Sequence, residues 1–261
     1  MSILQDLTQA LNLAYTNGKY DTVLQIAPEI LLELSQNNLL TAKKNVKVST
    51  SDLQITNKIL EMICTASLLS ESTDQESFSK YISLIKASPE NIELLWLHLI
   101  SLLSQGDFIQ HQQLSTKYHI LIPNFEKGKY AQFGKNLEVF LNEGNYGGVL
   151  KSFQEESQID KLILSFKSQF LELCRNEIGD NLESSYKNGL KLGAARSLLY
   201  FTTDLEVAAF AEERGWNVDK NGVINFVEEE EDLPKNNAYL DEDLDTVEIV
   251  LAYAQDLERV V

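Results

Sequence analysis

Histidine and cysteine side chains are the first candidates for chemistry in this sequence, and their spacing argues against a catalytic or metal site. His98, His111 and His119 form neither an H-x-H nor an H-E-x-x-H pair, so no zinc-binding helix is predicted. His98 lies in an apolar run, which is typical of a buried structural histidine. Cys64 and Cys174 fall within apolar helical patterns without C-x-x-C spacing, and Cys64 lacks the electropositive surroundings of a nucleophile. We therefore expect no catalytic residue and no metal ligand.

Cofactor motifs are missing as well. The chain contains no GxxxxGK[ST], GxGxxG or GxSxG segment, so neither a phosphate loop nor a nucleophile elbow is predicted. The acidic run at 228–232, EEEED, has the oxygen ligands that cations prefer but no fixed geometry, and we interpret it as a solvated linker. We expect no cofactor and no enzymatic activity.

The composition narrows the class of partner. The chain has 261 residues, 44% of them hydrophobic, and a formal net charge of −17. This charge opposes contact with nucleic acid or an anionic membrane surface, since both require basic patches. The N-terminal segment lacks a signal peptide pattern, and the longest uncharged apolar run, Leu94 to Leu103, is about half of a membrane span. The two cysteines fit a reduced compartment, so cytoplasm and nucleus are the expected locations.

Helical hairpins are the elements predicted to build most of the chain. The stretches AYTNGKY, LLSQGDF and FLNEGNY share an apolar pair before a glycine and an aromatic residue two positions after it. A glycine at the end of a helix supplies the left-handed conformation that closes it, and the aromatic residue can pack across the two helices. Three copies at unequal spacing indicate a degenerate, tetratricopeptide-like array, with an irregular helical bundle as the alternative. Amphipathic helices are also expected over 51–71 and 165–186.

The stretch from Ser197 to Phe226 has the order of a winged helix: two helices followed by a tight hairpin. Thr203 to Glu206 is a T-x-x-E capping box that begins the second helix, and Gly215 ends it. The sequence predicts that this helix is mostly buried, because apolar residues fall on nearly every side. The positions expected to be exposed are all acidic: Asp204, Glu206, Glu212 and Glu213. A DNA recognition helix would instead present basic or amide side chains.

The register of the hairpin follows from its apolar pattern. A two-residue loop at 221–222 would pair Val218 with Asn225 and mix polar with apolar side chains on both faces. A three-residue loop at 220–222, with Gly222 left-handed, places Trp216 opposite Phe226 and Val218 opposite Ile224 on one inward face. The second register is therefore predicted. The side chains left outside are candidates for partner contact: Asn217, Asp219, Val223 and Asn225.

An acidic linker and a final helix complete the chain. Nine acidic residues and one lysine lie between Glu228 and Asp245, which predicts an extended segment. The last residues form one apolar seam at helical spacing: Val247, Val250, Leu251, Ala254, Leu257 and Val261. This helix either packs back on its own domain or, as a candidate binding element, packs against helices of a partner.

Helical hairpins leading into an acidic winged helix resemble the PCI-domain family, the scaffold modules of the proteasome lid, the signalosome and a translation initiation complex. The resemblance is more specific in three segments: LTQALNLAYTNGKY, ARSLLYFTTDLEVAAFAEERGW and LAYAQDLERVV. These are similar to the small non-ATPase PCI subunits of the proteasome regulatory particle. The resemblance covers most of the chain and is weakest across Thr41 to Leu164 and in the acidic linker.

The resemblance implies a non-catalytic scaffold that assembles with other PCI and lid subunits as a hetero-oligomer. The fold it implies is mostly α, with a tetratricopeptide-like array, a winged-helix PCI module and a C-terminal helix that joins a bundle. The corresponding ranges are 1–164, 165–227, 228–244 for the linker and 245–261 for the bundle helix. The alternative within the same fold is a small PCI subunit of the signalosome or of the initiation complex.

Overall fold

The computed structural model describes residues 2–40, 50–70, 75–153, 160–186, 189–219 and 221–226. These residues are mostly helical, with one small sheet, as the sequence predicts. The chain divides into two compact units, Met1–Leu182 and Glu183–Val261. The predicted acidic linker and C-terminal helix lie outside the described residues.

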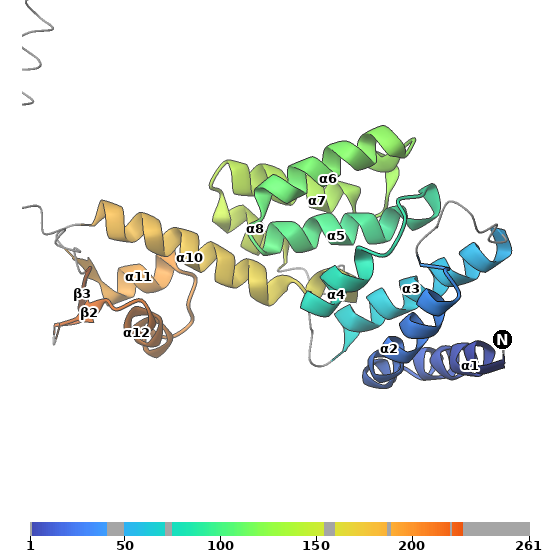
Figure 1. The fold of residues 1–261 in the computed structure, drawn as a ribbon. Helices are drawn as coiled ribbons and strands as arrows, with labels where there is room; N and C mark the ends of the chain where they lie inside the picture. The colour runs from blue at the N-terminus through green and yellow to red at the C-terminus, as the bar shows by residue number, and fades with distance from the viewer. Residues whose placement is uncertain are drawn as a thin grey trace, which may run out of the picture. The chain divides into compact units, whose positions relative to one another are not determined.

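The first unit is built from helices alone in its described part (Figure 1). The α-helices are α1 (Ser2–Thr16), α2 (Tyr20–Gln36), α3 (Thr50–Leu69), α4 (Gln75–Ile82), α5 (Ile92–Ser104), α6 (Phe108–Leu121), α7 (Ala131–Asn142), α8 (Tyr146–Ser152) and α9 (Lys161–Leu164). Two short 3-10 helices precede α5 and α7: η1 (Pro89–Asn91) and η2 (Phe125–Lys127). The long helix α10 (Lys167–Ser185) begins in this unit and ends in the second.

Three helical hairpins form where the glycine pattern predicts them. Gly18, Gly106 and Gly144 have φ values of +70°, +75° and +67°, the left-handed conformation that glycine adopts at low cost. In each turn, the N–H of the residue after the glycine donates back to the carbonyl five residues earlier, as Asn145 does to Phe140 at 2.8 Å. The paired helices α1 and α2, α5 and α6, and α7 and α8 pack against each other.

The aromatic residue of each hairpin pattern was expected to pack across its two helices. Tyr20 and Tyr146 do pack, partly buried, against the hydrophobic cores. Phe108 does not, because its side chain remains 39% exposed at the start of α6. The expectation is therefore wrong for the second copy. In that copy the apolar pair before the glycine is nearly fully buried: Leu102 is 6% exposed and Leu103 is 1% exposed.

Helix α5 is the centre of the first unit. It packs against α4 and against α6 and α7, and buries ten of its thirteen residues (Figure 1). Helix α3 also has neighbours on two sides, since Cys64 and Leu68 join the core around α5 while Ile59 and Ile63 join a separate core with α1 and α2. Helix α3 covers most of the predicted amphipathic segment 51–71, and its buried residues contribute to both cores.

Trp96 on α5 is held in a space that two glycines leave open. Its ring stacks on Phe125 with centroids 4.8 Å apart, and its indole N–H donates to the Phe125 carbonyl at 2.9 Å. A Cβ added at Gly128 would lie 2.8 Å from the indole Cδ1 and 2.7 Å from Ile92, and one at Gly134 would lie 3.0 Å from the indole Cε3. Both glycines are thus required by close packing rather than by backbone conformation.

Gly128→Ala should lower the free energy of unfolding by about 1–3 kcal/mol, because the added methyl group has no space beside Trp96. Gly193→Ala is the matched control, since a Cβ there meets nothing within 4 Å. It lies in a helix, where alanine is favoured over glycine, so it should be neutral or stabilising by up to ~1 kcal/mol. Chemical denaturation of the two variants measures the difference. Equal stabilities would show that the Trp96 site relaxes to accept the methyl group.

His98 is half-buried on the largely apolar helix α5. Its Nδ1 lies 3.3 Å from the hydroxyl of Tyr118, and burial lowers the pKa of His98 from 6.5 to about 4. The unfolded chain therefore takes up this proton at a higher pH than the folded chain does. Stability is independent of His98 above pH 6.5 and falls as the pH drops from 6.5 to about 4.

The loss of stability in acid should be smaller in His98→Gln, which has no titrating group. Burial also lowers the pKa of His111, so some acid dependence remains in the variant. Thermal unfolding of both proteins at pH 7.0, 6.0 and 5.0 measures the difference in slope. Parallel slopes would show that His98 protonates equally well in the folded and unfolded chains.

The second unit is a winged helix with three strands rather than two. Its elements are β1 (Leu190–Lys191), α11 (Leu192–Leu198), α12 (Asp204–Glu213), β2 (Asn217–Val218) and β3 (Val223–Asn225). The strand order is β1-β3-β2, and both pairs are antiparallel. The sequence predicts only the hairpin of β2 and β3. Strand β1 was missed because two residues are too short to show an alternating pattern.

Candidate protein-interaction surfaces

The hairpin has the predicted register. Val218 pairs with Ile224 and Asn217 with Asn225, which leaves residues 220–222 as the loop. The loop is closed by the Gly222 N–H, which donates to the Asp219 carbonyl at 2.9 Å, and Gly222 has a φ of +71°. A one-residue slip would have turned the buried Ile224 toward solvent, so burial selects this pairing.

An aromatic and charged cluster fixes the inner face of the hairpin. Trp216 is 6% exposed and meets Phe210 and Phe226 edge to face, at centroid distances of 5.6 and 4.9 Å. Trp216 and Phe226 lie on one side, as predicted, with their rings nearly perpendicular at 83°. The Trp216 indole N–H donates to Oε1 of Glu183 at 2.6 Å, and Nε of Arg214 donates to the same oxygen at 3.0 Å. Glu183 was not singled out in the sequence; it ties the end of α10 to the wing.

The predicted outer residues of the wing are mostly exposed. Asn217, Asp219 and Asn225 are exposed, whereas Val223 is half-buried because β1 pairs alongside it through Lys191. Val218 was predicted to face inward, and this is wrong: its side chain is 37% exposed on the edge strand β2. The hairpin therefore buries Trp216 and Ile224 and presents its edge strand and loop side to solvent.

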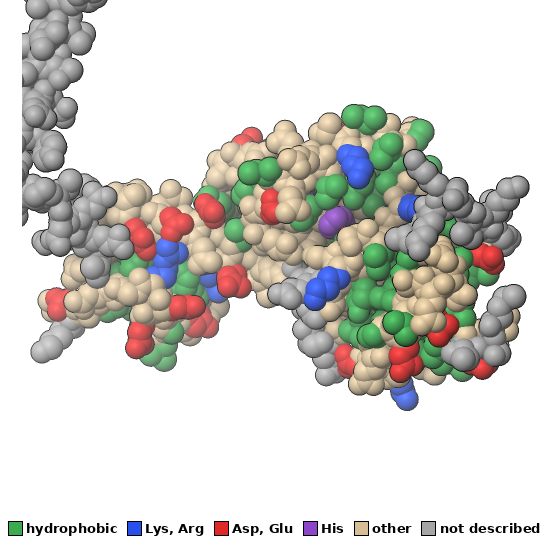
Figure 2. Space-filling model, in the orientation of Figure 1, with side chains coloured by type: hydrophobic (Ala, Val, Ile, Leu, Met, Phe, Trp, Pro, Cys, Tyr) green, Lys and Arg blue, Asp and Glu red, His purple; other side chains and the backbone are tan. Residues whose placement is uncertain are grey.

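Helix α12 is less buried than the sequence predicts. Only Val207 and Ala211 are buried within it, and Leu205 is 83% exposed. The capping box is present as predicted, with the Glu206 N–H donating to Oγ1 of Thr203 at 3.3 Å. The four acidic residues predicted to be exposed are exposed. Figure 2 shows acidic side chains bordering hydrophobic ones over this part of the unit. A surface of this kind repels phosphate and suits a protein partner.

The two cysteines are buried thiols. Burial is the main cause that raises the pKa of each, well above the usual range for Cys64 and to about 12 for Cys174. Neighbouring carboxylates, Glu61 and Glu177, raise them further. A thiol acts as a nucleophile through its thiolate, so neither cysteine is suited to that chemistry at neutral pH.

The polar cluster at Asp160 is a structural one. Asp160 accepts a hydrogen bond from the Tyr130 hydroxyl at 2.8 Å and from Nζ of Lys129 at 2.6 Å, and it also caps α9. Burial, followed by the hydrogen bond to Asp160, raises the pKa of Tyr130 to about 12. A tyrosine that acts as a base or nucleophile needs a lowered pKa, so this cluster ties α9 to the start of α7 and is not poised for catalysis.

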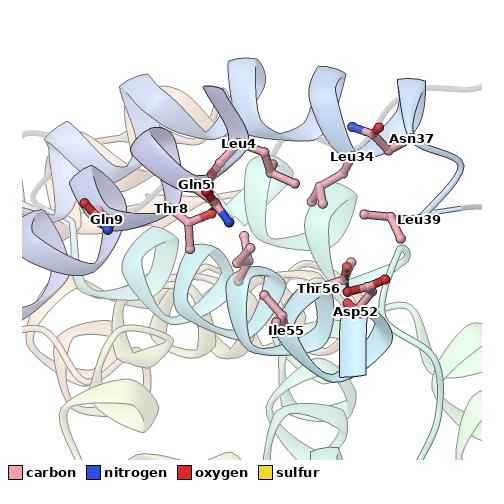
Figure 3. Close-up of a pocket in the computed structure, with 11 residues that line it drawn as sticks. Leu4, Gln5, Thr8, Gln9, Leu34, Asn37, Leu39, Asp52, Ile55 and Thr56 are labelled. Atoms are coloured by element: carbon pink, nitrogen blue, oxygen red, sulfur yellow. Dashed lines mark hydrogen bonds between the residues drawn. The ribbon is translucent and has the colours of Figure 1, made fainter. Parts of the chain in front are cut away.

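A groove of about 670 Å³ lies among α1, α2 and α3 (Figure 3). Leu4 and Leu34 point into it, and the hydroxyls of Thr8 and Thr56 are used within their own helices, donating to carbonyls one turn earlier. Among the described residues that line the groove, Asp52 is the one charged side chain. The groove therefore offers apolar contact and no pair of groups for acid–base chemistry.

Metal and membrane signals are absent from the described part of the chain. Within residues 2–226, gaps excepted, no three His, Cys, Asp or Glu side chains are grouped to hold a metal ion. In the same residues, no helix combines the length and hydrophobicity needed to cross a membrane.

Comparison with known proteins decides the family. The model of the CSN8/PSMD8/EIF3K family matches residues 89–236, a range that begins at η1 and includes α5 and the whole winged helix. The chain belongs to the CSN8/PSMD8/EIF3K family. The matched range thus contains most of the hydrophobic core around α5 and the whole acidic winged helix.

Relatives of this family align far beyond the matched range. The chain is 30% identical to the 26S proteasome regulatory subunit RPN12 of Saccharomyces cerevisiae, over 100% of both chains. It is 28% identical to the 26S proteasome regulatory subunit rpn12 of Schizosaccharomyces pombe, over 88% of this chain and 92% of that one. It is also 28% identical to the 26S proteasome non-ATPase regulatory subunit 8 of Caenorhabditis elegans, over 72% and 75% of the two chains.

Proposed function

We propose that this chain is a non-catalytic structural subunit of the lid of the 26S proteasome regulatory particle, in the cytoplasm and nucleus. The observation that carries the proposal is the alignment with a 26S proteasome regulatory subunit along the full length of both chains. Its role in this assembly is to hold other PCI and lid subunits together and to help join the lid to the base. Ubiquitin-dependent protein degradation would then depend on it without its taking part in the chemistry.

The winged helix serves this role as a protein–protein module. Its wing exposes the predicted contact residues Asn217, Asp219 and Asn225, and its second helix is acidic. These features favour contact with other subunits over contact with nucleic acid. The half-buried Val223 would support the contact from the middle strand of the sheet.

The C-terminal residues 245–261 supply the second contact. Their apolar seam lies outside the described residues, and its role as a bundle helix is carried by the sequence pattern alone. Docking against partner helices is proposed because the seam has the spacing of a helix that packs along one side.

The absence of a catalytic role is part of the same proposal. It is supported by the buried, high-pKa thiols of Cys64 and Cys174 and by the low pKa of the half-buried His98. At neutral pH the two thiols stay protonated, and an imidazole with a pKa of about 4 is a weak base, so none of the three groups is suited to a hydrolytic mechanism.

Affinity purification of the tagged full-length chain from its native cells, followed by quantitative mass spectrometry, tests the proposed function. We expect proteasome ATPases, lid subunits and protease-ring subunits in stoichiometric amounts. Stoichiometric signalosome or initiation-factor subunits would instead support the alternative scaffold role. Recovery of the chain without any of the three complexes would contradict a scaffold function altogether.

A further inference from the structure

The first turn of α12 exposes a large hydrophobic side chain. Leu205 is 83% exposed, more than any other large hydrophobic residue in the described part of the chain. A single exposed leucine is common on protein surfaces, whereas one that adjoins further apolar residues within a polar rim marks a candidate contact surface. The neighbours one helical turn further along are Ala208, half-buried, and Ala209, exposed.

These residues form a face of α12 that the winged helix does not use for its own core. The inward face consists of Val207 and Ala211, both fully buried, and Phe210, which packs against Phe201 and Trp216. Helical spacing puts the opposite residues together on a surface that we call the outer face of α12. It comprises Leu205, Ala208, Ala209 and Glu212, with Glu206 and Glu213 along its edge.

Contacts within the winged-helix unit fix the position of the outer face without a partner. The capping box fixes the start of the helix, because the Glu206 side chain accepts from the Thr203 N–H at 3.3 Å and the Thr203 hydroxyl accepts from the Glu206 N–H. Arg196 and Asp204 form an ion pair at 3.1 Å that links α11 to the first turn of α12. Because the helix backbone is already fixed, a partner has only the side chains of the outer face to order when it binds.

The position of this face is where a DNA-binding winged helix reads bases. Residues in the first turns of the second helix contact base edges in such proteins, through basic or amide side chains. Here that place holds a leucine and two alanines bordered by carboxylates. The small alanines allow another helix to approach closely. The leucine side chain can then pack into a groove between side chains of that second helix.

Charge identifies the kind of partner. Acidic side chains border the outer face, so an acidic surface would be repelled from it. This argues against a second copy of the chain, whose net charge is −17. It also argues against the chain's own C-terminal residues 245–261, which contain four acidic residues and one arginine.

We propose that the outer face of α12 binds an amphipathic helix of another subunit in the same assembly, one whose apolar stripe is flanked by lysine or arginine. The identity of the assembly rests on the proposed function; the chemistry of the partner rests on the outer face itself. Leu205 enters the apolar stripe of the partner, and Glu212 and Glu213 face its basic residues. This contact is separate from the seam at 245–261.

Site-specific photo-cross-linking tests the proposal in the complete complex. The photoreactive residue p-benzoylphenylalanine replaces Leu205 in the full-length chain, which is then assembled with the remaining lid subunits and irradiated. The control carries the same residue in place of Leu32, which is 60% exposed on α2 of the first unit. Mass spectrometry identifies the cross-linked peptides.

We expect position 205 to cross-link to one helical segment of another subunit that has basic residues beside an apolar stripe, and position 32 not to cross-link to that segment. A cross-link to residues 245–261, to a second copy or to an acidic segment would overturn the proposal, as would assembly without any cross-link at 205. If the chain fails to assemble with lid subunits at all, the proposed function is lost together with this inference. Whether the chain assembles with lid subunits therefore distinguishes a failure of the proposed function from a failure of this inference alone.

Three further variants separate binding from folding. Leu205→Glu should leave the thermal midpoint unchanged, because the side chain is exposed, while Val207→Glu buries a charge and should unfold the unit. The double variant Glu212→Lys, Glu213→Lys should reduce the cross-link yield from position 205 by about tenfold or more, because like charges would then meet. An unchanged yield would show that charge does not select the partner.

Discussion

Trp216→Ala should lower the free energy of unfolding of the winged-helix unit by roughly 3–5 kcal/mol, the range for truncating a large buried aromatic side chain. The indole is 6% exposed, touches two phenylalanine rings edge to face and donates its N–H to Glu183. Truncation removes these contacts and leaves the Glu183 carboxylate with one donor fewer. Chemical denaturation monitored by circular dichroism measures the effect.

Trp216→Phe is the matched control for this prediction. It keeps an aromatic ring against Phe210 and Phe226 and removes the hydrogen bond to Glu183, so the expected loss is smaller, about 1–2 kcal/mol. If Trp216→Ala unfolds like the parent but no longer binds its partners, Trp216 is an exposed contact in solution and the register of the wing is wrong.

Leu251→Asp should abolish incorporation of the chain into the proteasome regulatory particle. The seam carries five large apolar residues, which at ~1.5–3 kcal/mol each supply roughly 7–15 kcal/mol of gross driving force for docking. Ordering the helix offsets much of this, so the partner must bury nearly the whole seam. An aspartate at the centre of the seam would be buried without a partner charge. Native gel electrophoresis of assembled complexes, probed for the chain, measures incorporation.

Ala252→Asp is the control, because in the predicted helix the spacing puts position 252 on the side opposite the seam. It adds the same charge and should leave incorporation intact. The thermal midpoint of the isolated Leu251→Asp chain should match that of the parent. A large drop in that midpoint would show that the helix folds back on its own chain, and the docking hypothesis would fail.

The features that the sequence predicts well are local ones. A glycine at φ near +70° closes each hairpin at Gly18, Gly106 and Gly144, and the need for that conformation is visible from the residue type alone. The wing register was predictable because only one pairing brings Val218 opposite Ile224, and the alternative mixes polar and apolar residues on both faces.

The features that the sequence predicts poorly depend on contacts between distant segments. The burial of α12 was overestimated because apolar residues all around a helix were taken as a sign of burial, although Leu205 and Ala209 have no neighbour in the described part of the unit that covers them. Glu183 lies more than thirty residues before Trp216, and no local pattern links the two. Strand β1 is likewise defined only by its pairing with β3.

Removal and restoration of the chain in cells tests the central claim, a structural role in the regulatory particle, most directly. The endogenous chain is depleted, and the assembly state of the lid and base is followed on native gels while a plasmid supplies the parent or Leu251→Asp. The account predicts that depletion leaves a lid that does not join the base, that ubiquitin conjugates accumulate, and that only the parent chain restores both. A fully assembled, active 26S proteasome in cells that lack the chain would contradict it.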